Sequence, residues 1–418
     1  MKKIIQIIKN WLSRTNRNKR KKRASHSATT ITGKSKIVVN ETDTLLLQVE
    51  TFLQQEYEFR FNQLTEVTEF RKRSSTNEPF KPVGKRELNS LCIATRKNGI
   101  NCWDRDIQRY VHSEDIPTYH PFHTYMDNLP TWDGTDRVSL LAQRISSNQL
   151  WIDGFHKWML GMTVQWMGIQ SLHGNSISPV LVSQKQGKHK STFCRMLVPD
   201  ELQGYYTDSF DLTALSASEQ KLALFGLINL DELDKFSDRK MALLKNLMQM
   251  AGINVRKAYK RNFSALPRIA SFIATSNRKE LLTDPTGSRR FLCVEIEDKI
   301  SDAPIEHAQL YSQLKSEIFS GVRYWFTEEE EKAIMENNAS FQRRSMAEDV
   351  FHLCYEIPKT DEDYVLLSAA QMFTYMKKQY PSAMRDASEA SFSKTLTALG
   401  VKRIHSYRGN LYKVKSIS

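Results

Sequence analysis

The stretch PVLVSQKQGKHKSTFCRML, from Pro179 to Leu197, predicts the fold of the central part of this chain. Its apolar run Val180–Val182 is typical of a short buried strand. A polar segment with one glycine, Gly187, follows and leads into apolar residues at helical spacing. A strand, a polar loop, Lys-Ser and a helix form the layout of a phosphate-binding P-loop, in which backbone N–H groups and the positive end of the helix face the phosphates.

The candidate nucleotide-binding residues lie at the end of this loop and at the start of the helix. Lys190 is expected to reach the β- and γ-phosphates, and the Ser191 hydroxyl is expected to bind Mg²⁺. The match to G-x-x-x-x-G-K-[ST] is incomplete, because Gln184 and His189 occupy the two glycine positions. An ordinary helix start after a turn is the alternative interpretation. The predicted nucleotide-binding residues are Gly187, Lys188, His189, Lys190, Ser191 and Thr192.

A second motif follows downstream, where the apolar run LALFGLINL, Leu222 to Leu230, ends in Asp231-Glu232. A buried strand that ends in two acids is the Walker B layout. Asp231 is expected to hold Mg²⁺ directly or through water, and Glu232 to polarise the attacking water. A helix cap after a core strand would explain one acid, but it explains an acidic pair at the carboxyl end of a strand less well.

Two further segments complete the candidate catalytic set. RIASFIATSN, Arg268 to Asn277, predicts a third apolar strand, and Asn277 stands where a sensor residue would hydrogen-bond the water or the γ-phosphate. In DPTGSRRF, Arg289 and Arg290 are predicted to supply positive charge to the transferring phosphoryl group in a neighbouring subunit. An ordinary surface pair is the alternative for these two arginines. The predicted catalytic residues are Glu232, Asn277, Arg289 and Arg290.

Composition indicates a soluble chain of 418 residues whose positive charge is concentrated in a tail. Residues 1–40 carry 12 of the 60 Lys and Arg residues and no acid, which leaves 48 basic against 47 acidic residues in the remainder. The segment NRNKRKKR, Asn16 to Arg23, could bind nucleic-acid phosphates, and a solvated tail is the alternative. Five scattered cysteines without a C-x-x-C pair favour a reducing, cytoplasmic location and argue against a zinc cluster or a disulfide framework. No apolar run is long enough to predict stable insertion into a membrane.

The pattern predicts four regions along the chain. Residues 1–40 are expected to form a basic, disordered tail, and 41–138 an accessory region of mixed helices and strands. Residues 139–345 are expected to form the ATPase domain. Two helices followed by a hairpin signal at Tyr407–Asn410 predict a winged-helix-like domain over 346–418, which could contact duplex DNA or a protein.

Two groups of residues in the accessory region resemble metal ligands, but the sequence favours structural roles for both. Asp104 and Asp106 have Asp-x-Asp spacing, yet no apolar strand precedes them, so acids that open a helix are the better interpretation. The histidines lack paired ligand spacing and a supporting cysteine, which favours surface or core positions. These histidines are His112, His120 and His123.

Taken in order, these motifs resemble the virulence-associated protein E family, mobile-element and prophage ATPases related to superfamily 3 helicases of the AAA+ class. The segments that carry the resemblance are FHTYMDNLPTWDGTDRV (122–138), QGKHKSTF (186–193), INLDELDK (228–235), RKAYKRN (256–262), PRIASFIATSN (267–277) and DPTGSRRF (284–291). The resemblance implies an α/β fold with a P-loop AAA+ core, ATP and Mg²⁺ as cofactors, and a ring homo-oligomer, in that family a hexamer.

The same resemblance implies a DNA-binding hairpin in NVRKAYKRNF, Asn254 to Phe263. In superfamily 3 helicases such a hairpin projects into the central pore of the ring and grips single-stranded DNA. Basic side chains beside an aromatic ring suit sequence-independent binding of a single strand, and a solvated hairpin is the alternative. The predicted DNA-binding residues are Arg256, Lys257, Tyr259, Lys260 and Arg261, with Arg268 as a further basic neighbour.

The sequence therefore predicts an ATP-dependent DNA helicase or translocase that acts on single-stranded or forked DNA during replication of a mobile element. Two other classes remain open. One is a non-hydrolysing nucleotide switch or DNA-tethering module with a degenerate P-loop, and the other is an ATP-dependent remodeller of a protein partner.

Overall fold

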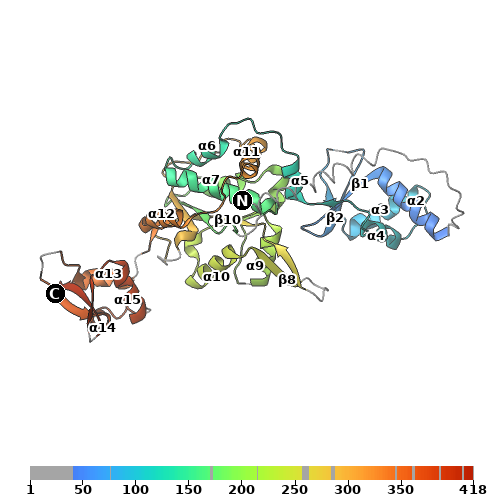
Figure 1. The fold of residues 1–418 in the computed structure, drawn as a ribbon. Coiled ribbons are helices and arrows are strands. Elements are labelled where there is room, and N and C mark those ends of the chain that lie inside the picture. Colours follow the sequence, from blue (N-terminus) through green and yellow to red (C-terminus); the bar gives the residue numbers. More distant parts are fainter. Residues whose placement is uncertain are drawn as a thin grey trace.

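The computed structural model describes ten segments of the chain, and these fold into three units that Figure 1 shows in sequence. The predicted basic tail, residues 1–40, lies outside the described residues. The described segments are 41–75, 77–169, 173–213, 215–256, 263–283, 288–343, 346–359, 363–385, 387–406 and 409–417.

The amino-terminal unit packs three helices against one face of a four-stranded sheet with the order β3-β2-β1-β4. Strands β1 and β2 form an antiparallel hairpin, in which Phe59 lies opposite Phe70. These two rings stack within the unit's own buried core. Apolar and polar residues alternate along the two strands because only one face of the sheet is buried. The elements are α2 (Glu41–Glu56), β1 (Tyr57–Asn62), β2 (Val67–Lys72), β3 (Lys81–Pro82), α3 (Lys85–Lys97), α4 (Asp104–Val111) and β4 (Thr118–Tyr119).

The central unit is a five-stranded parallel sheet with the order β11-β5-β10-β7-β6. The predicted α/β fold is confirmed, because the apolar runs of the sequence form fully buried strands, as parallel sheets require. The strands are β5 (Ser178–Val182), β6 (Tyr206–Thr207), β7 (Leu227–Leu230), β10 (Ser271–Ser276) and β11 (Phe291–Glu295).

Helices cover both faces of this sheet (Figure 1). On one face, α7 is buried almost all round, including Trp158 and Trp166, and it packs with α5, α6, α8 and α11. On the other face, α9 and α10 pack on side chains such as Val180 and Phe272, which alternate with Leu181 and Ile273 of the first face. The helices are α5 (Pro121–Asp127), α6 (Arg137–Gln143), α7 (Gln149–Trp166), α8 (Lys190–Met196), α9 (Leu215–Leu224), α10 (Asp238–Gln249), α11 (His307–Phe319) and α12 (Glu328–Asn338).

The core of the central unit begins before the expected boundary at residue 139. Phe122 and Met126 of α5 are buried with Trp166, and a Cβ at Gly226 would lie 2.4 Å from the Phe122 ring. This close approach explains the glycine. The amino-terminal unit contacts the same region, because the Asn62 side-chain amide donates to the Tyr205 hydroxyl at 2.7 Å. Short 3₁₀ turns complete the unit, namely η1 (Asp200–Tyr205), η2 (Leu233–Lys235), η3 (Ser288–Arg290) and η4 (Ala339–Phe341).

The carboxyl-terminal unit has its own buried core of three helices on a small antiparallel sheet. Its elements follow the order helix, strand, helix, helix, strand, strand once the short β12 is set aside. The predicted hairpin is confirmed as β14–β15, with its turn at 407–408 outside the described residues. The elements are α13 (Met346–Cys354), β12 (Tyr355–Glu356), β13 (Val365–Ser368), α14 (Ala369–Gln379), α15 (Glu389–Ala398), β14 (Arg403–Ser406) and β15 (Gly409–Ser416).

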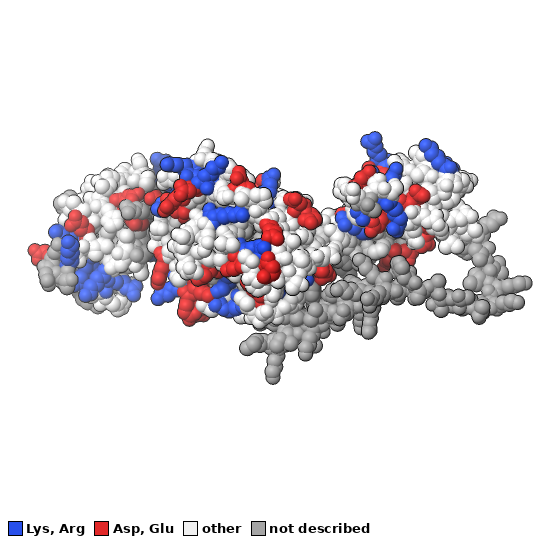
Figure 2. Space-filling model, turned by 90° about the horizontal axis from the view of Figure 1, so that it is seen from above, with Lys and Arg blue, Asp and Glu red and all other residues white. Residues whose placement is uncertain are grey.

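Charged side chains of both signs are interspersed over the face seen in Figure 2. This mixture agrees with the nearly neutral balance outside the tail. Within the described part of the chain, no helix combines the length and apolarity needed to cross a bilayer.

Candidate nucleotide-binding site

The sheet order brings three predicted motifs together at one edge. Strand β10 lies between β5 and β7 and runs parallel to both. The carboxyl ends of parallel strands meet at the same edge of a sheet, which is where ligands bind in open α/β folds. The residues that follow β5, β7 and β10, namely the P-loop, the acidic pair and Asn277, therefore surround one place.

Lys190 opens α8 and joins the loop to the central strand. Its ammonium group donates to the carbonyl oxygen of Ser183 at 3.1 Å and to the side-chain oxygen of Asn277 at 2.9 Å. The residue is only 8% exposed. Burial lowers the pKa of Lys190, and the negative charges of Asp231 and Asp234 oppose that shift. A buried cation at the start of a helix, next to a polar loop, is suited to binding an anion.

The loop keeps a left-handed backbone at its second glycine position, although His189 replaces the glycine there. Gly187 has φ +76°, and His189, which stands at the second glycine position, also has a positive φ of +62°. The backbone therefore adopts the left-handed conformation that glycine favours, with an imidazole in its place. His189 Nδ1 lies 3.6 Å from a carboxylate oxygen of Asp302, and Lys188 Nζ donates to the carbonyl of Glu297 at 2.6 Å.

The predicted metal ligands are in contact with each other. The Ser191 hydroxyl donates to Asp231 Oδ1 at 3.1 Å, across from α8 to the end of β7. The Thr275 hydroxyl of β10 donates to the same oxygen at 2.5 Å. A hydroxyl and a carboxylate are hard oxygen donors of the kind that Mg²⁺ takes together with phosphate oxygens and water, so the residues present fit that ion. The described residues contain no cluster of three or more His, Cys, Asp or Glu arranged for a metal, and a nucleotide-bound magnesium ion needs none.

Glu232 lies beside this pair in an unusual conformation. Its φ is +53°, its backbone N–H donates to the Thr275 hydroxyl at 3.2 Å, and its side chain is 41% exposed. The Glu232 carboxylate accepts from Lys235 Nζ at 2.6 Å. The predicted water-activating group is thus at the site's edge and is held by a neighbouring cation.

Asp234 ties the acidic motif to the end of β10. Its Oδ1 accepts from the Ser276 hydroxyl at 3.0 Å and from the Asn277 backbone N–H at 3.1 Å, while its side chain is 5% exposed. Sequence reasoning did not single out Thr275 or Asp234. A detectable signal was present, because hydroxyl and carboxylate groups stand directly beside the predicted site residues at both strand ends.

The two predicted trans-acting arginines lie far from this edge in their own chain. They precede β11, whose first residue Phe291 pairs with Ser178 at the start of β5, so a strand length of about 13 Å separates them from the P-loop edge. Arg289 pairs with Glu331 of α12 at 3.1 Å. This placement at the opposite end of the strands is compatible with action on a neighbouring subunit.

The predicted DNA-binding segment forms a hairpin whose tip lies outside the described residues. Strands β8 (Gly252–Arg256) and β9 (Phe263–Pro267) pair antiparallel, with Arg256 opposite Phe263. Lys257, Tyr259, Lys260 and Arg261 belong to the loop between them and are not described.

The inclusion of Arg268 in the basic cluster was wrong. Its guanidinium is buried, with 1% of the residue exposed, and donates to the carbonyl oxygens of Met248 at 2.5 Å, Ala270 at 2.8 Å and Asn175 at 3.0 Å. Burial lowers the pKa of Arg268 to about 9. This arginine fixes the base of the hairpin to the core, so it is not available to bind DNA.

Asp106, His120 and His123, three of the residues considered as metal ligands in the accessory region, have structural partners. Asp106 caps α4 by accepting from the Trp103 backbone N–H at 2.9 Å, as the helix-opening interpretation predicts. His120 caps α5 through Nδ1, which accepts from the His123 backbone N–H at 3.3 Å, and the two rings stack with centroids 3.7 Å apart. Burial, with the nearby His123, lowers the pKa of His120 to about 3.

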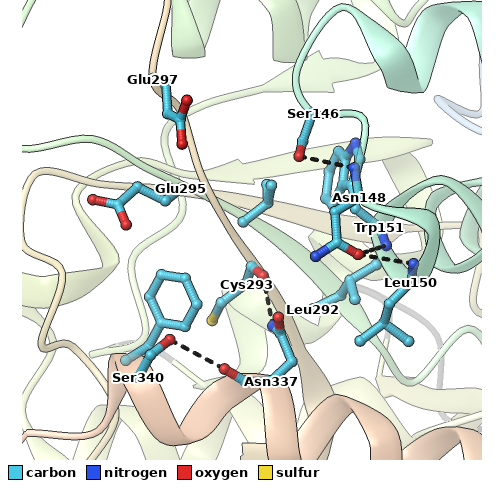
Figure 3. Close-up of a pocket in the computed structure, with 12 residues that line it drawn as sticks. Ser146, Asn148, Leu150, Trp151, Leu292, Cys293, Glu295, Glu297, Asn337 and Ser340 are labelled. Atoms are coloured by element: carbon cyan, nitrogen blue, oxygen red, sulfur yellow. Dashed lines mark hydrogen bonds between the residues drawn. The ribbon is translucent and has the colours of Figure 1, made fainter.

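A pocket of about 200 Å³ opens along the outer edge of β11 (Figure 3). The Asn337 side chain donates to the Cys293 carbonyl at 3.0 Å and so occupies part of the strand's free hydrogen-bonding edge. None of the predicted site residues lines this pocket. Its lining includes Asn148, Trp151, Cys293, Glu295, Glu297 and Asn337.

Comparisons with known proteins agree with the motif pattern. A model of the virulence-associated protein E-like domain matches residues 126–343, and residues 344–414 match a domain of unknown function, DUF3874. No curated protein matches the chain.

Solved structures similar to the chain include the apo structure of the NrS-1 C-terminal region, at 12% identity and a TM-score of 0.42, covering 90% of this chain and 99% of that one. Its A form is similar at 12% identity and a TM-score of 0.39, covering 89% and 99%. Because the first family model spans more than half of the 418 residues, the chain belongs to the virulence-associated protein E-like family.

Proposed function

We propose that this chain is a P-loop ATPase of the AAA+ class that couples ATP hydrolysis to movement on DNA during replication of a mobile genetic element. One observation carries the proposal. Lys190 meets Asn277, and Ser191 meets Asp231, at the carboxyl ends of three adjacent parallel strands. Three separate segments of sequence thus converge on one polar site. An ordinary helix start after a turn would not require that convergence.

Each residue has a defined task in this mechanism. The N–H groups of the loop and of the first turn of α8 would bind the phosphates, and Lys190 would neutralise charge on the β- and γ-phosphates. Ser191 and Asp231 would hold Mg²⁺, which would offset the negative charge that develops on the transferring phosphoryl group.

The remaining residues would act on the attacking water and on the negative charge of the transferring phosphoryl group. Glu232 would release Lys235, bind the attacking water and accept its proton. Asn277 would orient that water or the γ-phosphate. Arg289 and Arg290 would enter the site of a neighbouring subunit, which requires a ring oligomer. Their distance from the P-loop edge of their own chain supports this assignment.

The DNA-binding part of the proposal rests on the hairpin β8–β9 and on the basic tail. The hairpin is anchored at its base by Arg268, and the sequence between its two strands contains Lys257, Tyr259, Lys260 and Arg261, which lie outside the described residues. The carboxyl-terminal unit has the element order of a winged helix, with exposed Lys394, Lys402 and Arg403. We assign single-strand contact to the hairpin and duplex contact to this unit.

A non-hydrolysing nucleotide switch is the second candidate. Two observations favour it, namely the imidazole of His189 in a glycine position of the loop and the ion pair that holds Glu232 on Lys235. A switch would bind ATP as the motor does but would show no turnover.

Steady-state ATPase rates with and without single-stranded DNA test the proposal. If the chain is a DNA-translocating ATPase, single-stranded DNA should increase its turnover. The double variant Lys257→Ala with Lys260→Ala should lose that increase and keep the basal turnover. Losing about two phosphate contacts should also lower the slope of log affinity against log salt by roughly 1.4 on a single strand. Nucleotide binding without turnover would favour the switch, and no nucleotide binding at all would refute both.

A further inference from the structure

Thr275, near the end of β10, contacts both acids of the neighbouring strand through one hydroxyl group. The hydroxyl donates to Asp231 Oδ1 at 2.5 Å and accepts the Glu232 backbone N–H at 3.2 Å. Thr275 is 2% exposed. The single O–H donor and one acceptor position of the hydroxyl are therefore used within the site, away from solvent.

These two contacts have separate consequences. Asp231 Oδ1 receives two hydroxyl donors, Thr275 and Ser191, which together fix the rotation of its carboxylate. The second contact helps to hold the backbone of Glu232 at φ +53°, a left-handed conformation that is strained for a residue with a Cβ and persists only where its surroundings enforce it. A hydrogen bond to the amide of that residue is such an enforcing contact.

We propose that Thr275 is a positioning residue of the nucleotide site, which presents Asp231 to the metal and sets the direction of the Glu232 side chain through its backbone. This inference rests on the proposed function, because it names the residue that orders the two acids of that same site. Outer contacts to metal ligands commonly change metal affinity or activity by about 10–100-fold when they are removed. The neighbouring contacts of β10, from Ser276 and Asn277 to Asp234, position the strand end but do not reach either acid of the pair.

The test compares Thr275→Val, which keeps the shape and removes the hydroxyl, with Thr275→Ser, which keeps the hydroxyl and removes the methyl group. Binding of a fluorescent ATP analogue is titrated at increasing Mg²⁺ in the full chain. Thr275→Val should require about 10–100-fold more Mg²⁺ for the same affinity, while the affinity measured in EDTA stays unchanged. Thr275→Ser should follow the wild type in both conditions.

A second measurement needs no ligand. Amide hydrogen exchange of the peptide that contains Glu232 should become faster in Thr275→Val than in Thr275→Ser, because the valine leaves the Glu232 N–H without its acceptor. If Thr275→Val does not fold, Thr275→Ala serves in its place, since the smaller side chain avoids a clash.

The outcomes separate this inference from the function on which it rests. If the valine and serine variants share the wild-type Mg²⁺ dependence and exchange rate, Thr275 only fills space and the inference fails, although nucleotide binding stands. If the wild type binds no nucleotide with Mg²⁺ present, the proposed function fails and the metal part of this inference falls with it. Equal losses in both variants would also overturn the inference, because they would trace to packing.

Discussion

Lys190 Nζ lies 2.9 Å from the side-chain oxygen of Asn277, and this hydrogen bond joins the first residue of α8 to the end of β10. The ammonium group has three N–H donors. Asn277 accepts one of them, and the carbonyl oxygen of Ser183 accepts another. One donor is left for a phosphate oxygen, and Asn277 stands next to the place where that oxygen would lie. The contact therefore couples the loop proposed to bind the phosphates to the residue proposed to sense them.

Lys190→Ala should abolish ATP hydrolysis, because the loop would lose the cation that balances charge on the transferring phosphoryl group. Removing one preorganised electrostatic contact of this kind commonly costs about 10²–10³-fold in kcat. Turnover at saturating ATP and Mg²⁺ measures the effect. Wild-type turnover in the variant would refute the P-loop assignment.

The matched variant Lys190→Met separates charge from packing in the same position. Because burial lowers the pKa of Lys190, the protonated amine is penalised in the folded state at neutral pH. That penalty is present below the folded pKa and is relieved as the pH rises toward the unfolded value near 10.5. The stability of the wild type relative to Lys190→Met should therefore increase as the pH rises from 7 toward 10.5, which thermal unfolding of both proteins across this range measures.

Glu232→Gln should keep ATP binding and lose hydrolysis, because an amide cannot accept the proton of the attacking water. Loss of a general base typically costs about 10²–10⁴-fold. Nucleotide affinity and turnover are measured on the same preparation. A fall in affinity as steep as the fall in turnover would make Glu232 a metal ligand or a structural residue.

His189→Gly should stabilise the protein and tighten ATP binding. His189 has φ +62°, and a left-handed conformation costs a residue with a Cβ about 1–2 kcal/mol, part of which glycine's larger unfolded-state entropy cancels. The exposed contact with Asp302 contributes little, so a net gain of about 0.5–1 kcal/mol is expected in urea unfolding.

Gly187→Ala is the control for this substitution. Gly187 has φ +76°, and a methyl group added there would have no atom within 4 Å, so alanine should destabilise the loop through the backbone alone. If His189→Gly weakens ATP binding instead, the imidazole itself contacts the phosphates.

The sequence was sufficient to predict the strands and the edge at which their polar ends meet. Apolar runs mark β5, β7 and β10, and the rule for parallel sheets places the polar residues after each strand on one edge. The motifs did not reveal that β10 lies between the other two, because the order of strands in a sheet does not follow from their order in the chain. That order brings Asn277 to Lys190 and Thr275 to Asp231.

Two errors of sequence reasoning have physical causes. Arg268 was counted as a DNA-binding cation because basic residues are usually exposed. Here backbone carbonyls at the end of α10 and next to β5 satisfy the guanidinium inside the core. The start of the central unit was placed after Val138, because the segment before it is rich in Pro, Gly and Asp and suggested the end of the accessory region. Phe122 and Met126 instead belong to the buried core.

His120→Asn should make folding less sensitive to acid. Nδ1 of His120 accepts the His123 backbone N–H, so a proton there would break the cap of α5, and the pKa of His120 is lowered to about 3. The unfolded value is near 6.5, so the stabilisation is complete above that pH and is lost as the pH falls from 6.5 toward 3.

Asparagine keeps a capping oxygen but does not titrate in this range. Urea unfolding between pH 7.5 and pH 4.5 should show a slope for the wild type that exceeds the slope for His120→Asn by up to about 1.4 kcal/mol per pH unit. Parallel curves for the two proteins would mean that His120 takes up its proton without unfolding the cap.

Arg289→Ala should remove hydrolysis while leaving ATP binding intact, because the arginine is assigned to the neighbouring subunit's site. An arginine that stabilises the transition state in this way is worth about 10³–10⁵ in kcat. The ion pair with Glu331 is the alternative role, and Glu331→Ala removes that pair without removing the arginine. Turnover of the two variants distinguishes the roles, since a merely structural pair would make both substitutions equally mild.

Mixing two inactive proteins tests the action in trans directly. Lys190→Ala has a dead site and an intact Arg289, whereas Arg289→Ala has an intact site and lacks the arginine. In mixed rings, some Arg289→Ala sites would face the arginine of a Lys190→Ala neighbour, so part of the ATPase activity should return on mixing. Recovery should depend on total protein concentration because it requires assembly. Mixtures that stay as inactive as their components would place Arg289 outside the catalytic machinery and leave it as the partner of Glu331.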